Sequence, residues 1–350
     1  MTLYVGYKAA DIHPAMLNPG AVFHTLDIYH RHAIEKVFHG QARAICMPHL
    51  PATPSAAGLA VAEGAVDRWE RVVFRTGPKL MSGELSLDLL QECVRIGGAA
   101  GIHALPTGKD KDVRQPRAAA QPPPGVTLEF VGRERDRNDL LDKVRDRVDR
   151  EFKSEWRASV PGGAALDFIS CPGCFCHRRL DEGGLALAEV VTRDLAAAPL
   201  PAANLRLLDM GCGCGLVGLL VGDFLRGKTA ADGAGCDLVM IDSHTRAVEA
   251  ATENAARLGI PAEVILSDNG CPKRMDASFD VFVGNPPYYS DYRIADVFLE
   301  TARRALKPGG VCYTVCKNAA GLEPVQKKYF PETEIIRRRG YAVLKSHVPA

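Results

Sequence analysis

Short apolar runs, each ending at a glycine or a polar residue, recur through the second half of the chain. A continuous apolar run of this length is typical of a strand buried on both faces of a parallel sheet. Helical patterns follow the runs, and the one after Ser243 extends to about Leu258. This alternation predicts an α/β fold, a Rossmann-like doubly wound domain. The predicted strands begin at Leu207, Leu238, Glu263 and Phe279.

The first half of the chain shows the same alternation near its end. A strand is predicted at Arg71–Arg75, a helix at Leu85–Ile96 and, after two glycines, a strand at Ile102–Leu105. This strand, helix, double glycine, strand order echoes residues 280–315. No glycine-rich loop of the kind found at residues 211–215 occurs in this half. We therefore predict a cofactor-free, degenerate α/β domain there.

A proline-rich segment, Ala118–Gly125, is typical of an extended spacer between domains. A strand is predicted at Val126–Val131, followed by a charged helix that Asp139 would cap. That helix has one apolar face, which favours a buried side and a salt-bridged outer side, with RNA contact as the alternative. The apolar face comprises Leu141, Val144, Val148 and Phe152. The predicted parts are residues 1–118, 119–160 and 161–350.

A glycine-rich turn follows the strand that begins at Leu207. It contains Gly211, Cys212, Gly213 and Gly215, and Asp209 precedes it. Glycines at such a turn clear space for the amino acid and ribose of S-adenosylmethionine, and the Asp209 carboxylate can hold the ammonium group of this methyl donor. Gly213 to Gly218 also has the G-x-G-x-x-G spacing of a dinucleotide site. A tight turn without any ligand is the third interpretation.

The next two strands also end in side chains that suit a nucleoside. Asp242 and Ser243 follow the second strand, and a carboxylate there can accept both ribose hydroxyls of a methyl donor or a dinucleotide. Asp268 and Asn269 follow the third strand, where Asp268 can accept from an adenine amino group. The alternatives are a helix cap at Asp242 and an ordinary turn at Asp268.

The fourth strand runs into Asn285, Pro286, Pro287 and Tyr288. The Asn285 side-chain oxygen and the Pro286 carbonyl can each accept one N–H of a planar amino group, and Tyr288 can stack on the ring that carries it. Proline restricts φ and lacks an N–H, so the turn is stiff. With the glycine loop upstream, this turn predicts methyl transfer to an amino nitrogen, whereas a turn that only closes the strand is the alternative.

Composition agrees with a cytoplasmic enzyme. The 350 residues suffice for two domains, and the net charge of +1 does not by itself indicate nucleic acid. The first residues lack the basic and apolar regions of a signal peptide. The distribution of charge is more suggestive of RNA contact, because cationic side chains concentrate in three places, namely residues 109–117, Lys327–Lys328 and Arg337–Arg339.

Eleven cysteines, an odd number, favour reduced thiols. Cys171, Cys174 and Cys176 allow a metal hypothesis, but zinc usually requires two well-spaced ligand pairs, so no metal is predicted. His30, His32 and His39 fall on or beside a predicted helix from Leu26 to Phe38 and are expected on its solvated face.

Residues from about 160 to 350 resemble the small-domain methyltransferases, in particular the bacterial rRNA guanine-N2 methyltransferases. The resemblance includes Pro172–Gly183, which is similar to that family's Pro-Gly-x-Phe-Ser-x-x-x-Leu-Asp-x-Gly segment, and it extends to Ala305–Gly310, Val311–Lys317 and Arg338–Ser346. Cys176 stands where the family often has Ser, and Tyr288-Tyr289 replaces a more usual Phe-His.

The resemblance implies an S-adenosylmethionine-dependent enzyme acting on guanine N2 in ribosomal RNA, with the rRNA or a ribosomal assembly intermediate as partner. Related enzymes carry an N-terminal domain that looks like a methyltransferase without a cofactor site. The Tyr288-Tyr289 departure bears on which base is preferred. An adenine amino group or a protein glutamine amide is the alternative acceptor, because an Asn-Pro-Pro-Tyr turn serves all three. An RNA-binding assembly factor without activity and an NAD-dependent reductase are hypotheses from other classes.

Overall fold

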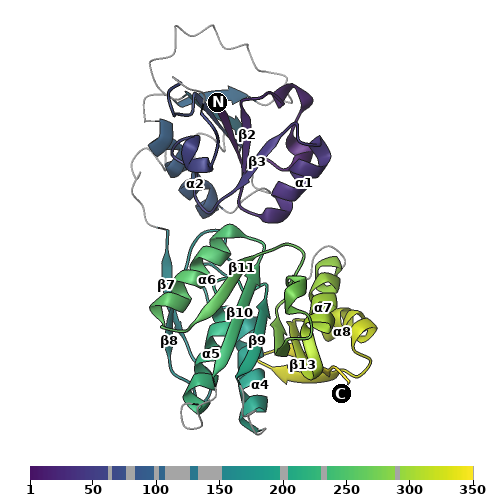
Figure 1. Cartoon of the computed structure of the whole chain (residues 1–350). Helices are drawn as coiled ribbons and strands as arrows, with labels where there is room; N and C mark the ends of the chain where they lie inside the picture. Colours follow the sequence, from purple (N-terminus) through teal and green to yellow (C-terminus); the bar gives the residue numbers. More distant parts are fainter. Residues whose placement is uncertain are drawn as a thin grey trace. The chain divides into compact units, whose positions relative to one another are not determined.

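The computed structural model describes residues 1–61, 65–75, 83–97, 102–106, 127–132, 152–197, 204–229, 235–287 and 292–349 (Figure 1). The chain divides into two compact units, Met1–Phe152 and Lys153–Ala350. The predicted boundary at residue 118 therefore needs correction. The strand β6 (Thr127–Gly132), which the prediction placed in the linker, pairs with two strands of the N-terminal sheet. The proline-rich spacer and most of the predicted charged helix lie outside the described residues.

The N-terminal unit contains a six-stranded parallel sheet in the order β3-β2-β1-β4-β6-β5. Alternate strand residues face two separate cores, one packed against α1 (Ile28–Phe38) and the other against α2 (Gly83–Gly97). The predicted helices and strands of this half are confirmed, except that His39 lies just beyond α1 in the left-handed region. The remaining strands are β1 (Thr2–Val5), β2 (Ala21–Thr25), β3 (Arg43–Cys46), β4 (Arg71–Arg75) and β5 (Ile102–Pro106).

The second unit is built on a seven-stranded sheet in the order β11-β10-β9-β12-β13-β15-β14. The first five of these strands are parallel, and β15 and β14 are antiparallel. Each of the four predicted strands is present. The strands are β9 (Leu205–Met210), β10 (Cys236–Asp242), β11 (Ala262–Leu266), β12 (Phe279–Gly284), β13 (Leu306–Cys316), β14 (Glu334–Arg338) and β15 (Tyr341–His347).

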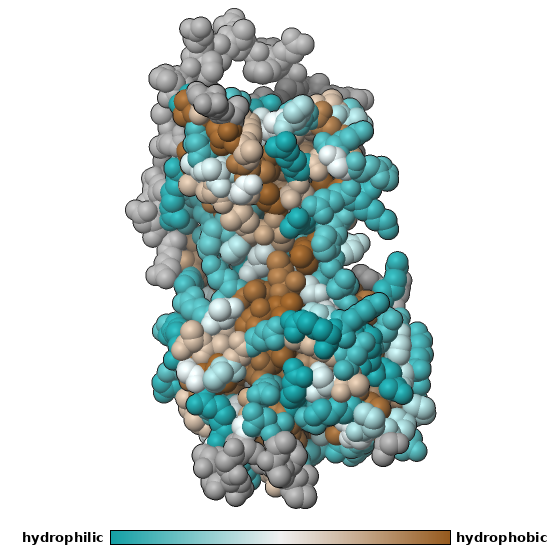
Figure 2. All heavy atoms as spheres, in the orientation of Figure 1, coloured by the Kyte–Doolittle hydropathy of each residue, from teal (hydrophilic) through white to brown (hydrophobic). Residues whose placement is uncertain are grey.

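Helices cover both faces of this second sheet, so the doubly wound prediction is confirmed. One core joins the sheet to α4 (Glu182–Ala197), α5 (Leu216–Thr229) and α6 (Thr245–Arg257). The other joins it to α7 (Arg293–Ala305) and α8 (Ala319–Tyr329). In Figure 2 the visible face of the N-terminal unit mixes apolar and hydrophilic side chains, and an apolar strip runs along the middle of the second unit between hydrophilic side chains. None of the described helices is long and apolar enough to cross a membrane.

The two sheets share part of their strand order. The sequence β3-β2-β1-β4 matches β11-β10-β9-β12, with a parallel sheet in both cases. Beyond β4, however, β6 takes the fifth place, whereas in the second unit β13 follows α7 and pairs directly with β12. The two units therefore share the order of four strands. The predicted echo of residues 280–315 holds for β4, α2 and β5 in chain order only, because β6 lies between β4 and β5 in the sheet.

A two-stranded antiparallel hairpin, β7 (Ser154–Ala158) and β8 (Leu166–Ser170), precedes α4 and was not predicted. The fully buried Asn254 of α6 fixes it to the second unit. Asn254 Oδ1 accepts from Ile169 N at 2.8 Å, and its Nδ2 donates to Ile169 O and to Cys214 O, both at 2.9 Å. One side chain therefore joins the hairpin, the helix α6 and the glycine loop.

Asn254→Ala should lower the free energy of unfolding of the second unit by roughly 3 kcal/mol, because three buried backbone groups lose their partners. Chemical denaturation measures the change. Asn204→Ala, the same substitution at an exposed residue that bonds Gly235 N, serves as control. Equal stability of the two variants would contradict the anchoring role of Asn254.

Candidate functional site

Strand register brings the glycine loop and the proline turn together. Met210, the last residue of β9, lies opposite Gly284 of β12 and opposite Ile241 of β10. Neighbouring strands are about 4.8 Å apart. Gly211 and Asn285, which follow Met210 and Gly284, therefore leave the sheet side by side at its carboxyl edge. The two motifs, separated by about seventy residues, belong to one site.

Backbone amides of the glycine loop donate hydrogen bonds to the end of β10. Gly211 N and Cys212 N donate to Ile241 O at 2.8 and 3.0 Å, and Gly213 N donates to Asp242 Oδ2 at 2.9 Å. Gly211 has φ +70°, and a Cβ there would lie 2.6 Å from the Phe298 ring. A Cβ on Gly213 would meet nothing within 4 Å, so the loop is open at that residue. These amides are therefore committed to the fold rather than to a ligand.

Asp209 lies under the loop at only 2% exposure. Its Oδ2 accepts from Gly218 N at 2.8 Å, in the first turn of α5. Burial, and secondarily the charges of Asp242 and Asp181, raise the pKa of the Asp209 carboxyl to about 7. A cationic group nearby would favour its ionised form. The predicted contact with an ammonium group stays a prediction. The structure shows in addition that Asp209 fixes the start of α5 through Gly218 N.

Asp242 ends β10, and both of its carboxylate oxygens accept backbone amides. Oδ2 accepts from Gly213 N and Oδ1 from His244 N, each at 2.9 Å. The carboxylate is half-buried and remains next to the open part of the loop. Ser243 follows it, also half-buried. Because each oxygen can accept a second hydrogen bond, these contacts orient Asp242 and are compatible with the predicted ribose contact.

The third predicted pair follows β11. Asp268 is half-buried and Asn269 is exposed. Ser267 Oγ donates to Asn269 Oδ1 at 2.9 Å and to Gly270 O at 2.8 Å, which closes a tight turn. Since Leu266 lies opposite Asp242, this turn leaves the same edge of the sheet. Asp268 is therefore in the region where the prediction placed it, and its adenine contact stays a prediction.

The proline turn begins directly after β12. Pro286 is buried and Pro287 half-buried, whereas Tyr288 lies outside the described residues. Asn285 Nδ2 donates to Asp181 Oδ2 at 2.9 Å. Gly284 packs so closely that a Cβ would lie 3.0 Å from the Phe298 ring, the same ring that contacts Gly211. Phe298 thus joins the loop to the turn.

Asp181 is the residue that the sequence predictions missed. It precedes α4, and burial raises the pKa of its carboxyl, although amide hydrogen bonds from Gly184, Asn285 and Gly183 oppose that shift. With Asp209 and Asp242 it forms a group of three carboxylates around the glycine loop. Burial and the charges of Asp242 and Asp209 also raise the pKa of the Cys212 thiol. The signal was present in the Leu-Asp-x-Gly segment, where no role was assigned.

The cysteine segment before α4 packs against the start of α6. Cys171 Sγ and Cys174 Sγ lie 3.7 Å apart, and each contacts the carbonyl oxygen of Arg246 at 3.6 Å. Hydrogen bonding to Cys174 and burial raise the pKa of the Cys171 thiol. Among the described side chains, no group of three or more His, Cys, Asp or Glu forms a metal-binding arrangement.

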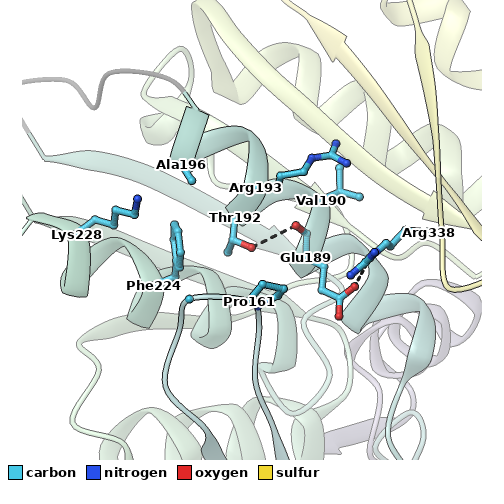
Figure 3. Close-up of a pocket in the computed structure, with 10 residues that line it drawn as sticks. Pro161, Glu189, Val190, Thr192, Arg193, Ala196, Phe224, Lys228 and Arg338 are labelled. Carbon is cyan, nitrogen blue, oxygen red and sulfur yellow. Dashed lines mark hydrogen bonds and ion pairs between the residues drawn. The ribbon is translucent and has the colours of Figure 1, made fainter.

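A hollow of about 560 Å³ lies elsewhere, between α4, α5 and the loop after β7 (Figure 3). Lys228, which lines it, is twelve residues beyond the start of α5, roughly 18 Å along that helix. Glu189 and Arg338 line the hollow and form an ion pair, and the Glu189 side chain, only 4% exposed, also pairs with Arg339. The hollow is therefore not part of the glycine-loop site, and two arginines of the predicted basic cluster are engaged by α4.

Comparison with known proteins places this site in a family context. The family described as Methyltransferase small domain matches residues 165–345. Ribosomal RNA small subunit methyltransferase C of Pseudomonas syringae pv. tomato is 30% identical over 171 residues, 47% of this chain and 45% of the relative. Ribosomal RNA large subunit methyltransferase G of the same organism is 28% identical over 176 residues, 49% of this chain and 43% of the relative. The chain thus matches about half the length of these relatives.

A solved structure has a similar fold over nearly the whole chain. The Thermus thermophilus 16S rRNA guanine-N2 methyltransferase, in complex with AdoMet and guanosine, superposes with a TM-score of 0.67 at 15% identity. The superposition covers 99% of this chain and 88% of that one. At this identity the likeness establishes the fold, including an N-terminal unit of related architecture.

Proposed function

The chain belongs to the methyltransferase small domain family, and on that premise we propose that it is an S-adenosylmethionine-dependent N-methyltransferase acting on guanine N2 in ribosomal RNA. The relatives named as rRNA methyltransferases, and the guanosine-bound structure of similar fold, support this acceptor. The proposed partner is rRNA or a ribosomal assembly intermediate, and the proposed location is the cytoplasm. The proposed site residues are those at the carboxyl edge of the second sheet.

One observation carries the choice of methyl donor: three carboxylates surround a glycine loop whose amides are already bonded within the fold. Asp181, Asp209 and Asp242 lie close enough that the other two charges raise the pKa of Asp209. A pyrophosphate would be repelled by these carboxylates and would find few loop amides to bind. A sulfonium and an ammonium group would be attracted. The electrostatics therefore favour S-adenosylmethionine over a dinucleotide.

The residues present fit that donor, which supplies an electrophilic methyl group when bound. Asp242 can accept the ribose hydroxyls, and the space beside Gly213 can receive the methionine part. Asn285 Oδ1 and the Pro286 carbonyl can each accept one N–H of the acceptor amino group. No strong base is needed before transfer, because the proton can leave to water afterwards. The contribution of the turn is mainly orientation of a conjugated, weakly nucleophilic nitrogen.

The alternatives differ in what they leave unexplained. An adenine amino group or a glutamine amide would use the same proline turn, so the acceptor rests on the relatives rather than on the turn. A reductase would give no role to the Asn285 turn. An assembly factor without activity would not require Asp209, Asp242 and Asn285 to be assembled at one edge. The enzymatic hypothesis explains all three.

The N-terminal unit is proposed to recognise RNA without binding the donor. At the end of its β1, where the second unit has the glycine loop, the buried Tyr7 ring packs against Tyr4 and Phe23. Arg75, the last residue of β4, lies 5.7 Å above that ring and pairs with Asp11. An aromatic ring and an ion pair therefore stand where donor-binding turns would be expected.

Mass mapping of nucleosides tests the function directly. Ribosomal RNA from a strain lacking this protein should miss one methylated guanosine, and the purified protein with S-adenosylmethionine should restore it. The target base has to leave its stack to reach the site, so an exposed or incompletely assembled substrate should react faster. A restored methyl group on adenosine, or on a ribosomal protein instead of RNA, would select one of the alternatives.

Asp242→Ala should weaken S-adenosylmethionine binding by roughly 1–3 kcal/mol, because hydrogen bonds from ribose to a charged group are lost. Calorimetry with purified protein gives the value. Asp237→Ala, five residues earlier on the same strand, is the matched control, since its carboxylate bonds the exposed Asn204 amide. Tight NADH binding by the unaltered protein, without binding of the methyl donor, would contradict the proposal.

A further inference from the structure

We propose that Asp181 is a positioning residue: it fixes the side-chain amide of Asn285 so that the amide oxygen, rather than the nitrogen, is presented to the acceptor amino group. The inference rests on the proposed function, because it assigns Asn285 to the acceptor. It adds a residue that lies 104 positions earlier in the chain and outside the two motifs.

The chemistry of the pair selects one amide orientation. Asn285 Nδ2 lies 2.9 Å from Asp181 Oδ2. An ionised carboxylate only accepts hydrogen bonds, whereas an amide has one donating and one accepting end. The donating end of Asn285 must therefore face Asp181, and Oδ1 takes the other direction. An acceptor amino group is itself a donor, so it requires that oxygen.

Asp181 is in turn held firmly by α4. Gly183 N donates to Asp181 Oδ1 at 3.0 Å, and Leu185 N donates to the Asp181 backbone oxygen at 2.9 Å. A Cβ on Gly184 would lie 2.6 Å from Asp181 Oδ2, so the carboxylate is seated directly against the first turn of the helix. The amides and dipole at that helix end favour the ionised form. A fixed carboxylate can orient its partner.

Strand register connects this pair to the methyl donor. Gly284, which precedes Asn285, lies opposite Met210, which precedes the glycine loop. A rotation of the Asn285 amide would therefore change the hydrogen bonding offered next to the proposed methyl group without moving the loop itself. This argument separates the proposed role from a simple helix cap. A cap affects the stability of α4, whereas an orienting contact affects transfer more than donor binding.

An exchange of the two side chains provides the test. In Asp181→Asn, the new amide oxygen should stay with the α4 amides, so its nitrogen would face Asn285 and turn that amide around. Single-turnover methyl transfer to rRNA, measured at saturating donor, should slow about tenfold or more, the order expected for losing a hydrogen bond to a charged group. The donor Kd should rise by a smaller factor, because one of the three carboxylates near the glycine loop loses its charge. Asp167→Asn, at an exposed residue paired with Arg157, should leave both values unchanged.

The reciprocal double variant, Asp181→Asn with Asn285→Asp, restores a donor facing an acceptor and leaves a carboxylate oxygen for the acceptor amino group. It should transfer faster than Asp181→Asn alone. A double variant no faster than Asp181→Asn alone, or an unchanged rate in Asp181→Asn, would overturn the proposal. A cap role alone predicts no recovery on exchange.

A second measurement does not depend on activity. The side-chain amide protons of Asn285, assigned in an NMR spectrum by their loss in Asn285→Asp, should shift in Asp181→Asn and stay in place in Asp167→Asn. If the unaltered protein binds the donor yet transfers no methyl group to RNA, the proposed function fails. The amide resonance then decides the Asp181 proposal alone, and a resonance insensitive to Asp181→Asn would overturn it.

Discussion

Asn285→Ala should reduce single-turnover methyl transfer to rRNA by about two orders of magnitude or more while leaving S-adenosylmethionine affinity within about tenfold, because the lost contacts orient the acceptor in the transition state. The donor contacts proposed for Asp242 and the glycine loop come from β9 and β10, whereas Asn285 follows β12. Rapid-quench transfer assays and calorimetry on the same preparation measure the two quantities separately.

Asn204→Ala is the matched control, since it makes the same change at an exposed residue bonded to Gly235 and Asp237. Its transfer rate should equal that of the unaltered protein. The Asn285 variant should also unfold cooperatively at a similar temperature, which excludes a folding defect. Full turnover by Asn285→Ala would mean that the proline turn only closes β12 and that the acceptor is oriented elsewhere.

The second unit was predictable because its apolar runs and turns carry local information. Leu238–Ile241, for example, is a continuous apolar run, and only a strand covered on both faces buries all of it. The ends of the runs then placed Asp209, Asp242 and Asn285 at one edge. The strands β1 to β3 gave weaker signals because they are short and separated by irregular segments.

Long-range pairing could not be predicted in the same way. The strand β6 was expected from its own sequence, but its place between β4 and β5 depends on pairing partners at both sides. Asn254 is similar: its three hydrogen bonds reach a hairpin 85 residues away and a loop 40 residues away. Nothing in the helical pattern of α6 distinguishes such an asparagine from an exposed one.

The Asp181–Asn285 contact lies between these cases. The Leu-Asp-x-Gly segment was noted only as part of the family resemblance, and Asn285 was predicted to bind the acceptor. That the two residues are hydrogen-bonded is seen only in the folded chain, where the start of α4 meets the end of β12. The predicted arginine cluster shows the opposite outcome. Arg338 and Arg339 were candidates for RNA contact from their sequence alone, and in the structure Glu189 binds both. A cluster of arginines in the sequence therefore predicts RNA contacts only for those side chains that are not already paired with carboxylates of the same protein.

Removing residues 1–152 should reduce methylation of a structured rRNA fragment by about two orders of magnitude or more, the order expected when several phosphate contacts are lost. The cut follows the unit boundary at Phe152 and leaves β7 with its partner β8. Donor binding should persist, because every proposed donor contact lies in the second unit. The comparison is between full-length and truncated protein at matched donor saturation.

A short single-stranded oligonucleotide containing the target guanine serves as control substrate, since it needs little structural recognition. The two proteins should methylate it at similar rates, and only the full-length protein should lose RNA affinity steeply as salt rises, because it releases more counterions. The truncated protein can still make some phosphate contacts through Arg337. Arg338 and Arg339 can add to them less, because both pair with glutamates of α4. Equal rates on structured rRNA, with the truncated protein folded and donor-bound, would refute RNA recognition and leave the N-terminal unit a stabilising role.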